Sequence, residues 1–259
     1  MVKKEKPWKA LQGRVNPIFL TISFIVLLIA IWQLFFKSSI FIALPNQVIA
    51  SMPSTWPDYL GALKSTIVEF ISSLLLSIAF GVPIGFLIAW KDGAFRTLNP
   101  LLGIALVTPK IAFVPLITLW LGISGNSSAV ALGVLLGIFP IIVNTIAGLR
   151  ATNQEYLPLA RSIGLSQVQI FRKIILPSFY PFLFVGMFLA SSLCMTGVLL
   201  MEMVLEHPGV GYLILYYSNE YLTSRVYAAS VFTIMVTLSI SGSLWYLSKH
   251  FEQRNASSA

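Results

Sequence analysis

The sequence predicts an all-α integral membrane protein with about six transmembrane helices and with both termini in the cytoplasm. Three observations lead to this fold class: the composition, the lengths of the apolar runs, and the positions of the basic residues. Of the 259 residues, 57% are hydrophobic and 10% are charged, and the mean hydropathy is +0.85. A soluble protein has roughly 25% charged residues and could not cover so much apolar surface. Lipid must therefore solvate much of this chain.

The apolar runs have the lengths that cross a bilayer. A spanning helix needs about 20 mostly apolar residues, and six runs qualify, at residues 18–36, 71–89, 98–121, 129–149, 179–201 and 226–247. We expect a single transmembrane domain of residues 18–248 between tails at 1–17 and 249–259. The 37–60 segment is rich in turn-forming residues such as Pro45, Pro53 and Pro57, and it is expected to connect the first two spans.

The basic residues set the orientation. Thirteen of the 17 Lys and Arg residues fall in four segments, at 1–17, 91–96, 150–173 and 249–259. If the N-terminus lies inside and the spans are as predicted, all four segments face the cytoplasm, where Lys and Arg are enriched in membrane proteins. The net charge of +8 is therefore interpreted as an orientation signal and not as a nucleic-acid-binding surface.

The third run is irregular. Pro109 and Pro115 lie inside it, and each interior proline removes a helix hydrogen bond and kinks the chain. Such breaks persist in membranes where protein or water satisfies the freed backbone, so this helix is expected to face the bundle interior. Lys110 is an ionisable residue within a span. It could meet an anionic solute in a pathway, or it could snorkel or pair with a carbonyl that Pro109 leaves free.

The longest basic loop, residues 150–177, has helical patterning. Leu157, Ala160 and Ile163 recur at helical spacing, and Gly164 then breaks the run. Ser166 is a suitable N-cap for a second short helix, which Pro177 is expected to end. Two short helices of this kind expose an apolar stripe that needs a partner. The pattern alone fits either lipid headgroups or a cytoplasmic protein.

This loop resembles the cytoplasmic motif of the permease subunits of bacterial ABC importers, which has the form E-A-A-x3-G-x9-I-x-L-P. Five residues stand at the matching offsets: Ala160, Gly164, Ile174, Leu176 and Pro177. The sequence departs from the motif at Pro158 and Leu159, which replace its Glu and first Ala, so the carboxylate that the motif would present to the partner is absent from this position. Glu155 lies one helical turn earlier and could supply that charge.

The resemblance covers roughly residues 44–250 and is closest to the nitrate-, sulfonate- and taurine-type permeases. The matching features are Gly81-x-Pro83-x-Gly85, the proline-rich stretch 108–122, Pro140 with Asn144, and Glu202 followed by Pro208-Gly-Val-Gly211. It implies a type I importer fold in the bacterial inner membrane. It also implies a second permease copy, two ATPase subunits on the cytoplasmic loops, and an extracytoplasmic solute-binding protein. The substrate would be a small anion or organic nutrient.

The pathway residues suggested on this basis are Pro109, Lys110, Pro115, Asn144 and Glu202. Glu202 could act as a gate or contact the binding protein, or it could be an interfacial carboxylate. Small residues at Gly81, Gly85, Gly133 and Gly137 are expected to allow close helix packing.

The chain is not expected to be an enzyme. The sequence contains no Gly-x4-Gly-Lys-Ser/Thr phosphate loop, so ATP and Mg are expected in the partner subunit, and no cofactor or metal is expected here. Gly122-Ile-Ser-Gly125 is similar to the nucleophile motif of rhomboid proteases, but the last span has no His to activate Ser124. A secondary transporter working without an ATPase is the other alternative, although no internal duplication is visible.

Overall fold

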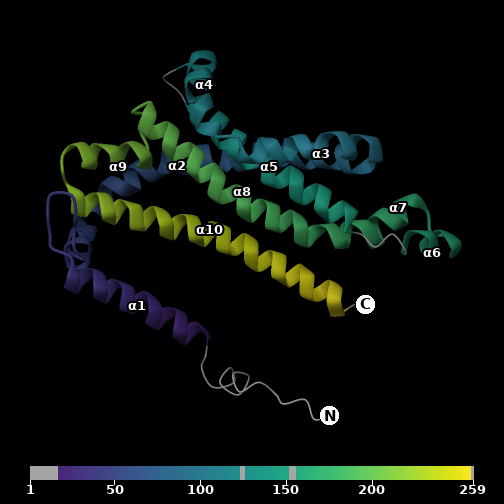
Figure 1. Cartoon of the computed structure of the whole chain (residues 1–259), viewed down its shortest axis with the longest axis horizontal. Coiled ribbons are helices and arrows are strands. Elements are labelled where there is room, and N and C mark those ends of the chain that lie inside the picture. The colour runs from purple at the N-terminus through teal and green to yellow at the C-terminus, as the bar shows by residue number, and fades with distance from the viewer. Residues whose placement is uncertain (1–16, 123–125, 152–155, 258–259) are drawn as a thin grey trace, which may run out of the picture.

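The computed structural model describes residues 17–122, 126–151 and 156–257, and all regular elements within them are helices (Figure 1). In chain order they are α1 (Pro17–Phe35), α2 (Pro45–Trp90), α3 (Asp92–Val107), the 3-10 turn η2 (Lys110–Phe113), α4 (Val114–Leu121), α5 (Asn126–Arg150), α6 (Tyr156–Ser162), α7 (Gln167–Ile170), the π-helical segment η3 (Phe171–Ile175), α8 (Leu176–Val204), α9 (Val210–Asn219) and α10 (Thr223–Ser257).

The all-α membrane fold is confirmed. Four helical segments are long and apolar enough to cross a membrane on their own: α2, α5, the continuous stretch from α7 through α8, and α10. The helix pair from α3 to α4 passes the same test as one bent unit, which gives up to five spans. The first predicted span, at 18–36, corresponds to α1, whose apolar helix is shorter than the other predicted spans. The predicted runs at 129–149, 179–201 and 226–247 lie within α5, α8 and α10.

The expected connection at 37–60 is mostly helical, which corrects the prediction. α2 begins at Pro45 and continues for 46 residues, with Pro53 and Pro57 inside it. Proline suits the first helical turn, because the N–H it lacks has no intrahelical partner there. At Pro53 and Pro57, further along the helix, the burial of neighbouring side chains outweighs the hydrogen bonds that the prolines remove. Thr55 and Tyr59 are completely buried in α2, and Tyr59 packs against α9 and α10.

The third span is broken, as its prolines predict, although it begins at Asp92 and not at 98. α3 ends at Val107, and the chain then bends by 85° into η2 and α4. Figure 1 shows α4 projecting from the rest of the molecule. We call the segment from α3 to α4 the elbow. None of the α3 side chains is buried, so the expected placement in the bundle interior is wrong for α3 within this single chain. In α4, Val114 and Ile117 are buried against the core of the bundle.

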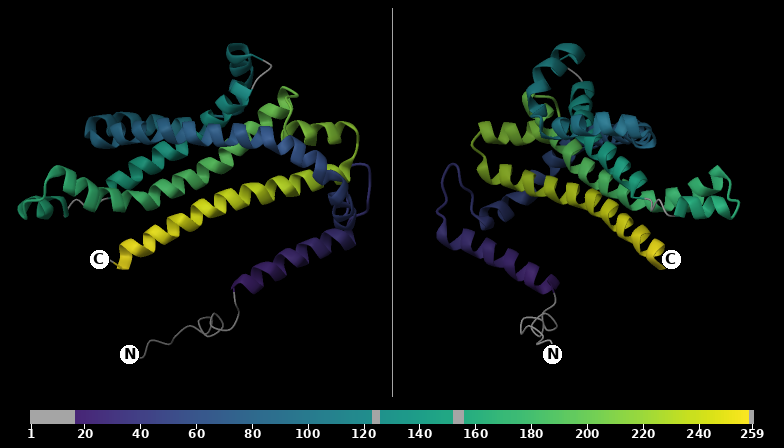
Figure 2. Two further views of the ribbon diagram at one scale, coloured as in Figure 1. Left: turned by 180° about the vertical axis from the view of Figure 1, so that it is seen from behind. Right: turned by 45° about the vertical axis from the view of Figure 1, so that its right-hand side comes forward.

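The core forms where α2, α5, α8 and α10 pack together (Figure 2). Close packing at glycines is confirmed. A Cβ on Gly85 would lie 2.7 Å from Thr145 Cβ, and one on Gly137 would lie 2.3 Å from the Cys194 sulfur. Within a bilayer the hydrophobic effect does not drive helices together. The close approach at these glycines instead supplies van der Waals contact, which helps to hold membrane helices together. The bundle thereby fixes both ends of α8, which carry the two candidate sites described next.

Candidate functional site

The first candidate site is the loop between α5 and α8, at the right-hand end of Figure 1. α6 ends in a Schellman motif: the Leu165 N–H donates to the Ala160 carbonyl (3.1 Å), and the Gly164 N–H donates to the Arg161 carbonyl (3.0 Å). This motif needs a left-handed residue after the helix, and Gly164 has φ +79°. The predicted break at Gly164 is confirmed, and its cause is backbone conformation, because a Cβ there would meet no neighbour.

The second half of the loop begins at the predicted cap. Ser166 Oγ accepts from the Gln169 N–H (3.3 Å), and the Ser166 N–H donates to Gln169 Oε1 (2.8 Å), which is a complete capping box. The prediction that Pro177 ends this short helix is wrong. α7 passes through the π-helical segment into α8, and Pro177 is the second residue of α8, so it stands inside a continuous helical stretch, directly after the π-helical segment.

Three apolar side chains around the glycine bend are exposed. Leu159, Ile163 and Val168 have relative accessibilities of 59%, 69% and 61%, whereas Ala160 is buried at 3%. Ile174, Leu176 and Pro177 are half-buried where the loop joins α8. Pro158 lies in α6, and Glu155 lies outside the described residues. The bend therefore presents an apolar surface on a backbone that capping holds in shape.

The loop is anchored to the helices beside it. At its start, Arg150 forms an ion pair with Asp92 (2.8 Å) and lies over the Phe95 ring at 3.7 Å. Phe171 makes an edge contact with Phe86 of α2, at 6.2 Å between ring centroids. These contacts join the loop to the start of α3 and to the end of α2, so a displacement of the loop would reach the elbow.

At the elbow, Lys110 Nζ donates to the Leu106 carbonyl at the end of α3 (3.2 Å) and lies 5.0 Å from the centre of the Phe139 ring. This geometry corresponds to the structural interpretation of Lys110, although the ammonium remains only partly covered. Pro109 forms the break, and Pro115 stands in the first turn of α4. Asn144 lies apart from them in α5, where its amide donates to the Pro140 carbonyl (2.9 Å).

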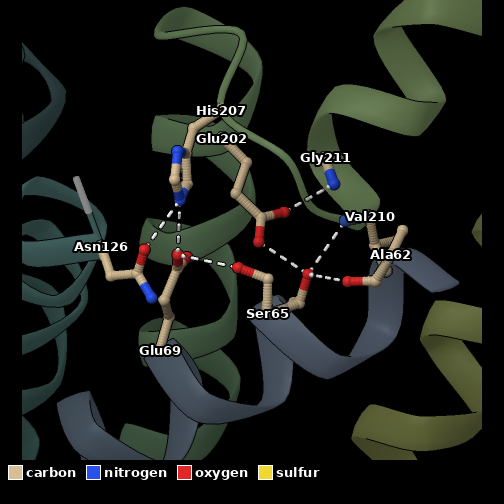
Figure 3. A network of polar contacts seen from close by, with 9 residues as sticks. Ala62, Ser65, Glu69, Asn126, Glu202, His207, Val210 and Gly211 are labelled. Atoms are coloured by element: carbon tan, nitrogen blue, oxygen red, sulfur yellow. Dashed lines mark hydrogen bonds and ion pairs between the residues drawn. The ribbon is translucent and has the colours of Figure 1, made fainter. Parts of the chain in front are cut away.

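The second candidate site is a buried polar network at the other end of α8 (Figure 3). Glu202 is completely buried, which excludes an interfacial carboxylate. Its Oε2 accepts from the Gly211 N–H (2.7 Å), and its Oε1 accepts from the Thr66 hydroxyl (2.6 Å). Thr66 Oγ1 in turn accepts from the Val210 N–H (2.9 Å). Glu202 and Thr66 therefore cap the N-terminus of α9, where free N–H groups and the helix dipole favour an anion.

Glycines make this cap possible. A Cβ on Gly209 would lie 2.1 Å from Glu202 Oε1, and one on Gly211 would lie 2.3 Å from the Leu199 carbonyl oxygen. The Pro-Gly-Val-Gly sequence thus lets the backbone approach the carboxylate closely. The resemblance identified Glu202 and these glycines, but not Thr66 or α9 itself.

A second carboxylate completes the network. Glu69 is fully buried and adjacent to Glu202. Its Oε1 accepts from Ser65 (3.3 Å) and lies 3.2 Å from His207 Nε2, which is also 2.9 Å from Asn126 Oδ1. Because both neighbours are acceptors, Nε2 carries the hydrogen. The position of Glu69 just before an apolar run was a sequence signal for this second carboxylate.

The far end of α9 is held by a second polar contact. The Tyr217 hydroxyl donates to Asp58 Oδ2 at 2.7 Å. Burial, reinforced by the Asp58 carboxylate, raises the pKa of Tyr217 to about 12, so the phenol keeps its proton near neutrality. α9 is thereby fixed to α2 at both ends.

Among the residues that the structure describes, no three His, Cys, Asp or Glu side chains lie close enough to share a metal ion. Ser124 lies outside the described residues, and His207 is engaged by Glu69 and Asn126.

The arrangement defines a polytopic helical membrane protein with an exposed apolar corner at one end of the core helix α8 and a buried polar cap at the other. Comparison with known proteins identifies the class. Residues 81–256 match the family model of the binding-protein-dependent transport system inner membrane component. The chain belongs to this family of ABC importer permeases, and its place is the inner membrane.

Its relatives fall within the predicted type. It is 33% identical to the formylaminopyrimidine transport permease protein ThiX of Halalkalibacterium halodurans over 71% of each chain. It is 26% identical to the nitrate import permease protein NrtB of Leptolyngbya laminosa, over 87% of this chain and 84% of the relative. The taurine transport system permease protein TauC of Escherichia coli is 24% identical, over 84% and 82% of the two chains.

The fold is that of a solved importer. An inward-facing structure of the MetNI methionine ABC transporter superposes with a TM-score of 0.65, at 16% identity, over 77% of this chain and 98% of the other. The predicted type I importer fold is confirmed.

Proposed function

We propose that this permease is driven by a separate ATPase that docks on the loop at 150–177. The observation that carries the proposal is the exposed apolar surface of Leu159, Ile163 and Val168 around the glycine bend. An apolar surface on a rigid, capped corner is suited to a groove in a protein partner. It stands at the positions where the permease motif Ala160, Gly164, Ile174, Leu176 and Pro177 is matched.

The working assembly would contain two ATPase subunits, a second copy of this chain and an extracytoplasmic solute-binding protein. ATP and Mg²⁺ would bind in the ATPases, since this sequence lacks a phosphate loop. The excess of basic residues in and around the loop supports its placement in the cytoplasm. Closure of the ATPase pair would pull on the loop, and α8 and the Arg150–Asp92 contact would carry the movement into the bundle.

The substrate would be a small anion or organic nutrient. Relatives are named for formylaminopyrimidine, nitrate, taurine and aliphatic sulfonates, and the partly covered ammonium of Lys110 is compatible with an anion. In this proposal Pro109, Lys110 and Pro115 shape the pathway at the elbow between two permease copies. Asn144 and Glu202 belong to the helices that move against it.

The docking surface can be tested with one substitution and a matched control. Ile163→Ser removes an exposed apolar contact from the loop, while Ile49→Ser changes a residue of similar exposure, 65%, in α2. Co-purification of the importer's ATPase from detergent extracts should fall several-fold for Ile163→Ser and stay unchanged for Ile49→Ser. Equal recovery with both variants would contradict the docking site. Transport by the chain alone, driven by an ion gradient in liposomes, would overturn the ATP-driven function.

A further inference from the structure

A cavity lies at the end of the molecule opposite to the loop at 150–177, outside both candidate sites. It has a volume of about 330 Å³ and lies between the α1–α2 connection and the corner from α9 to α10. The walls are joined by hydrogen bonds from Thr223 to the Ile40 carbonyl and from Ser51 to the Ser224 carbonyl (3.0 Å). A second cavity of about 360 Å³ shares Ile40, Tyr221 and Thr223 with it.

The chemistry of the lining is that of an oxyanion site. Arg225 is the one charged residue in the lining, and no carboxylate is among the lining residues. Its guanidinium forms a long ion pair with Asp58 (3.9 Å) and lies 5.7 Å from the centre of the Tyr217 ring. These contacts engage part of its five N–H donors, and the side chain remains 36% exposed, so the other donors can bind a ligand. Arginine donors match the oxygens of a phosphate or sulfonate group.

Two neutral side chains offer further donors. Ser39 Oγ accepts from the N–H groups of Phe41 (3.3 Å) and Ile42 (3.1 Å), which leaves its own hydroxyl hydrogen to donate. Gln47 Oε1 accepts from the Leu44 N–H (2.9 Å) and from Ser38 (3.0 Å), which leaves the amide N–H groups of Gln47.

The surroundings indicate where the oxyanion comes from. Aromatic side chains ring this corner: Phe41 contacts Tyr221 and Trp32 contacts Tyr227, at 6.5 and 5.5 Å between ring centroids. Aromatic rings of this kind mark the depth of lipid headgroups. α1 and α10 leave the corner and diverge (Figure 2), with exposed apolar side chains such as Phe24 and Leu238 along them. Acyl chains would find apolar surface directly beside the cavity.

Tyr221 stands at the corner between α9 and α10. It adopts φ +56° as the left-handed residue of a Schellman motif, in which the Leu222 N–H donates to the Tyr217 carbonyl (2.9 Å) and the Tyr221 N–H donates to the Ser218 carbonyl (3.2 Å). This turn places Tyr221 in the lining of both cavities.

We propose that this cavity binds the phosphate group of a membrane phospholipid, with Arg225, Ser39 and Gln47 as donors and with the acyl chains lying along α1 and α10. α1 contacts little of the bundle other than α2, so the lipid would fill the space beside it. The family match begins at residue 81, so the α1–α2 wall of the cavity lies outside the matched region. The lipid site is independent of the ATPase proposal, and the two can fail separately.

Native mass spectrometry of the purified, delipidated full-length chain can test the site. Three probes are added separately: phosphatidylglycerol, dioleoylglycerol, which lacks the phosphate, and inorganic phosphate. We expect one phosphatidylglycerol to bind, dioleoylglycerol not to bind, and inorganic phosphate to compete only at much higher concentration. Binding of inorganic phosphate as tight as that of phosphatidylglycerol would retain the oxyanion site but assign it to a soluble ion.

Variants then locate the binding. Arg225→Gln should weaken phosphatidylglycerol binding about tenfold, because a charged hydrogen-bond donor is lost. Ile40→Trp, at a wall residue that is 63% exposed, should block the cavity by volume without disturbing the core. Lys64→Gln removes a basic residue that does not line the cavity and should bind as the wild type does. Unchanged binding by both Arg225→Gln and Ile40→Trp, or equal binding of dioleoylglycerol, would overturn the proposal.

Discussion

At the scale of single residues, the two buried carboxylates have different surroundings. Both oxygens of Glu202 accept hydrogen bonds, whereas Glu69 Oε2 is buried without one. Glu202→Gln would place an amide NH2 against a hydrogen-bond donor, and we expect the substitution to lower the free energy of unfolding by about 1–3 kcal/mol. Glu69→Gln keeps Oε1, and the introduced N–H can donate to Glu202. This substitution should therefore change the free energy of unfolding by no more than about 0.5 kcal/mol. Thermal unfolding of both variants in detergent measures the contrast. Equal losses would contradict the hydrogen-bond assignment.

The glycine at the α9 cap gives a second prediction at this scale. Gly209→Ala places a methyl group within 2.1 Å of Glu202 Oε1, and the overpacking should cost about 1–3 kcal/mol. Gly242→Ala, in α10, meets no neighbour within 4 Å and should stabilise by about 0.5–1 kcal/mol because alanine favours helix. The same unfolding measurement compares them. If the two alanines behaved alike, steric approach to Glu202 would not be the reason for the glycine.

At the scale of elements, periodicity and length predicted the long helices, because an apolar run of about 20 residues is a direct consequence of bilayer thickness. Turn chemistry also predicted the Gly164 break and the Ser166 cap, which depend on local backbone geometry. Contacts between residues that are distant in the sequence could not be predicted in this way. α2 runs through Pro53 and Pro57 because distant residues bury Tyr59, and α9 begins where Glu202 and Thr66, far away in sequence, cap it.

The loop gives a prediction that separates backbone conformation from size. Gly164 is left-handed and meets no neighbour, and asparagine tolerates this conformation far better than a β-branched residue does. Gly164→Asn should retain ATP-driven transport in proteoliposomes, whereas Gly164→Val should reduce it at least tenfold while the ATPase continues to hydrolyse ATP. Transport by Gly164→Val at the wild-type rate would show that the bend does not couple the two activities.

At the scale of the whole molecule, α8 joins the two candidate sites. The π-helical segment makes it continuous with the apolar corner at Val168, and its last turn carries Glu202, which caps α9. A movement of the loop at 150–177 would reach the α9 cap along this continuous helical stretch, in which the π-helical segment and Pro181 are the places where the helix can bend. The elbow is coupled to the same loop through Arg150 and Asp92. If the proposed ATPase docks on this loop, both ends of the molecule are connected to it.

The topology depends on two segments at the limit of what can cross a membrane. α1 has 19 residues, or about 28 Å at 1.5 Å per residue, which is slightly less than a hydrocarbon core of about 30 Å. The elbow bends by 85°. If both cross the membrane, the chain has six spans, and the basic residues place its two ends in the cytoplasm. If only one crosses, the ends lie on opposite sides.

Reporter fusions decide between these topologies. A fluorescent protein fused after Ala259 folds only in the cytoplasm and should fluoresce, while alkaline phosphatase, which needs an oxidising compartment, should be active when fused after Glu220 and inactive after Ala259. A fluorescent protein at the N-terminus should also fluoresce. Active phosphatase after Ala259 together with a fluorescent N-terminus would mean an odd number of spans. One of the two segments, α1 or the elbow, would then not cross the membrane.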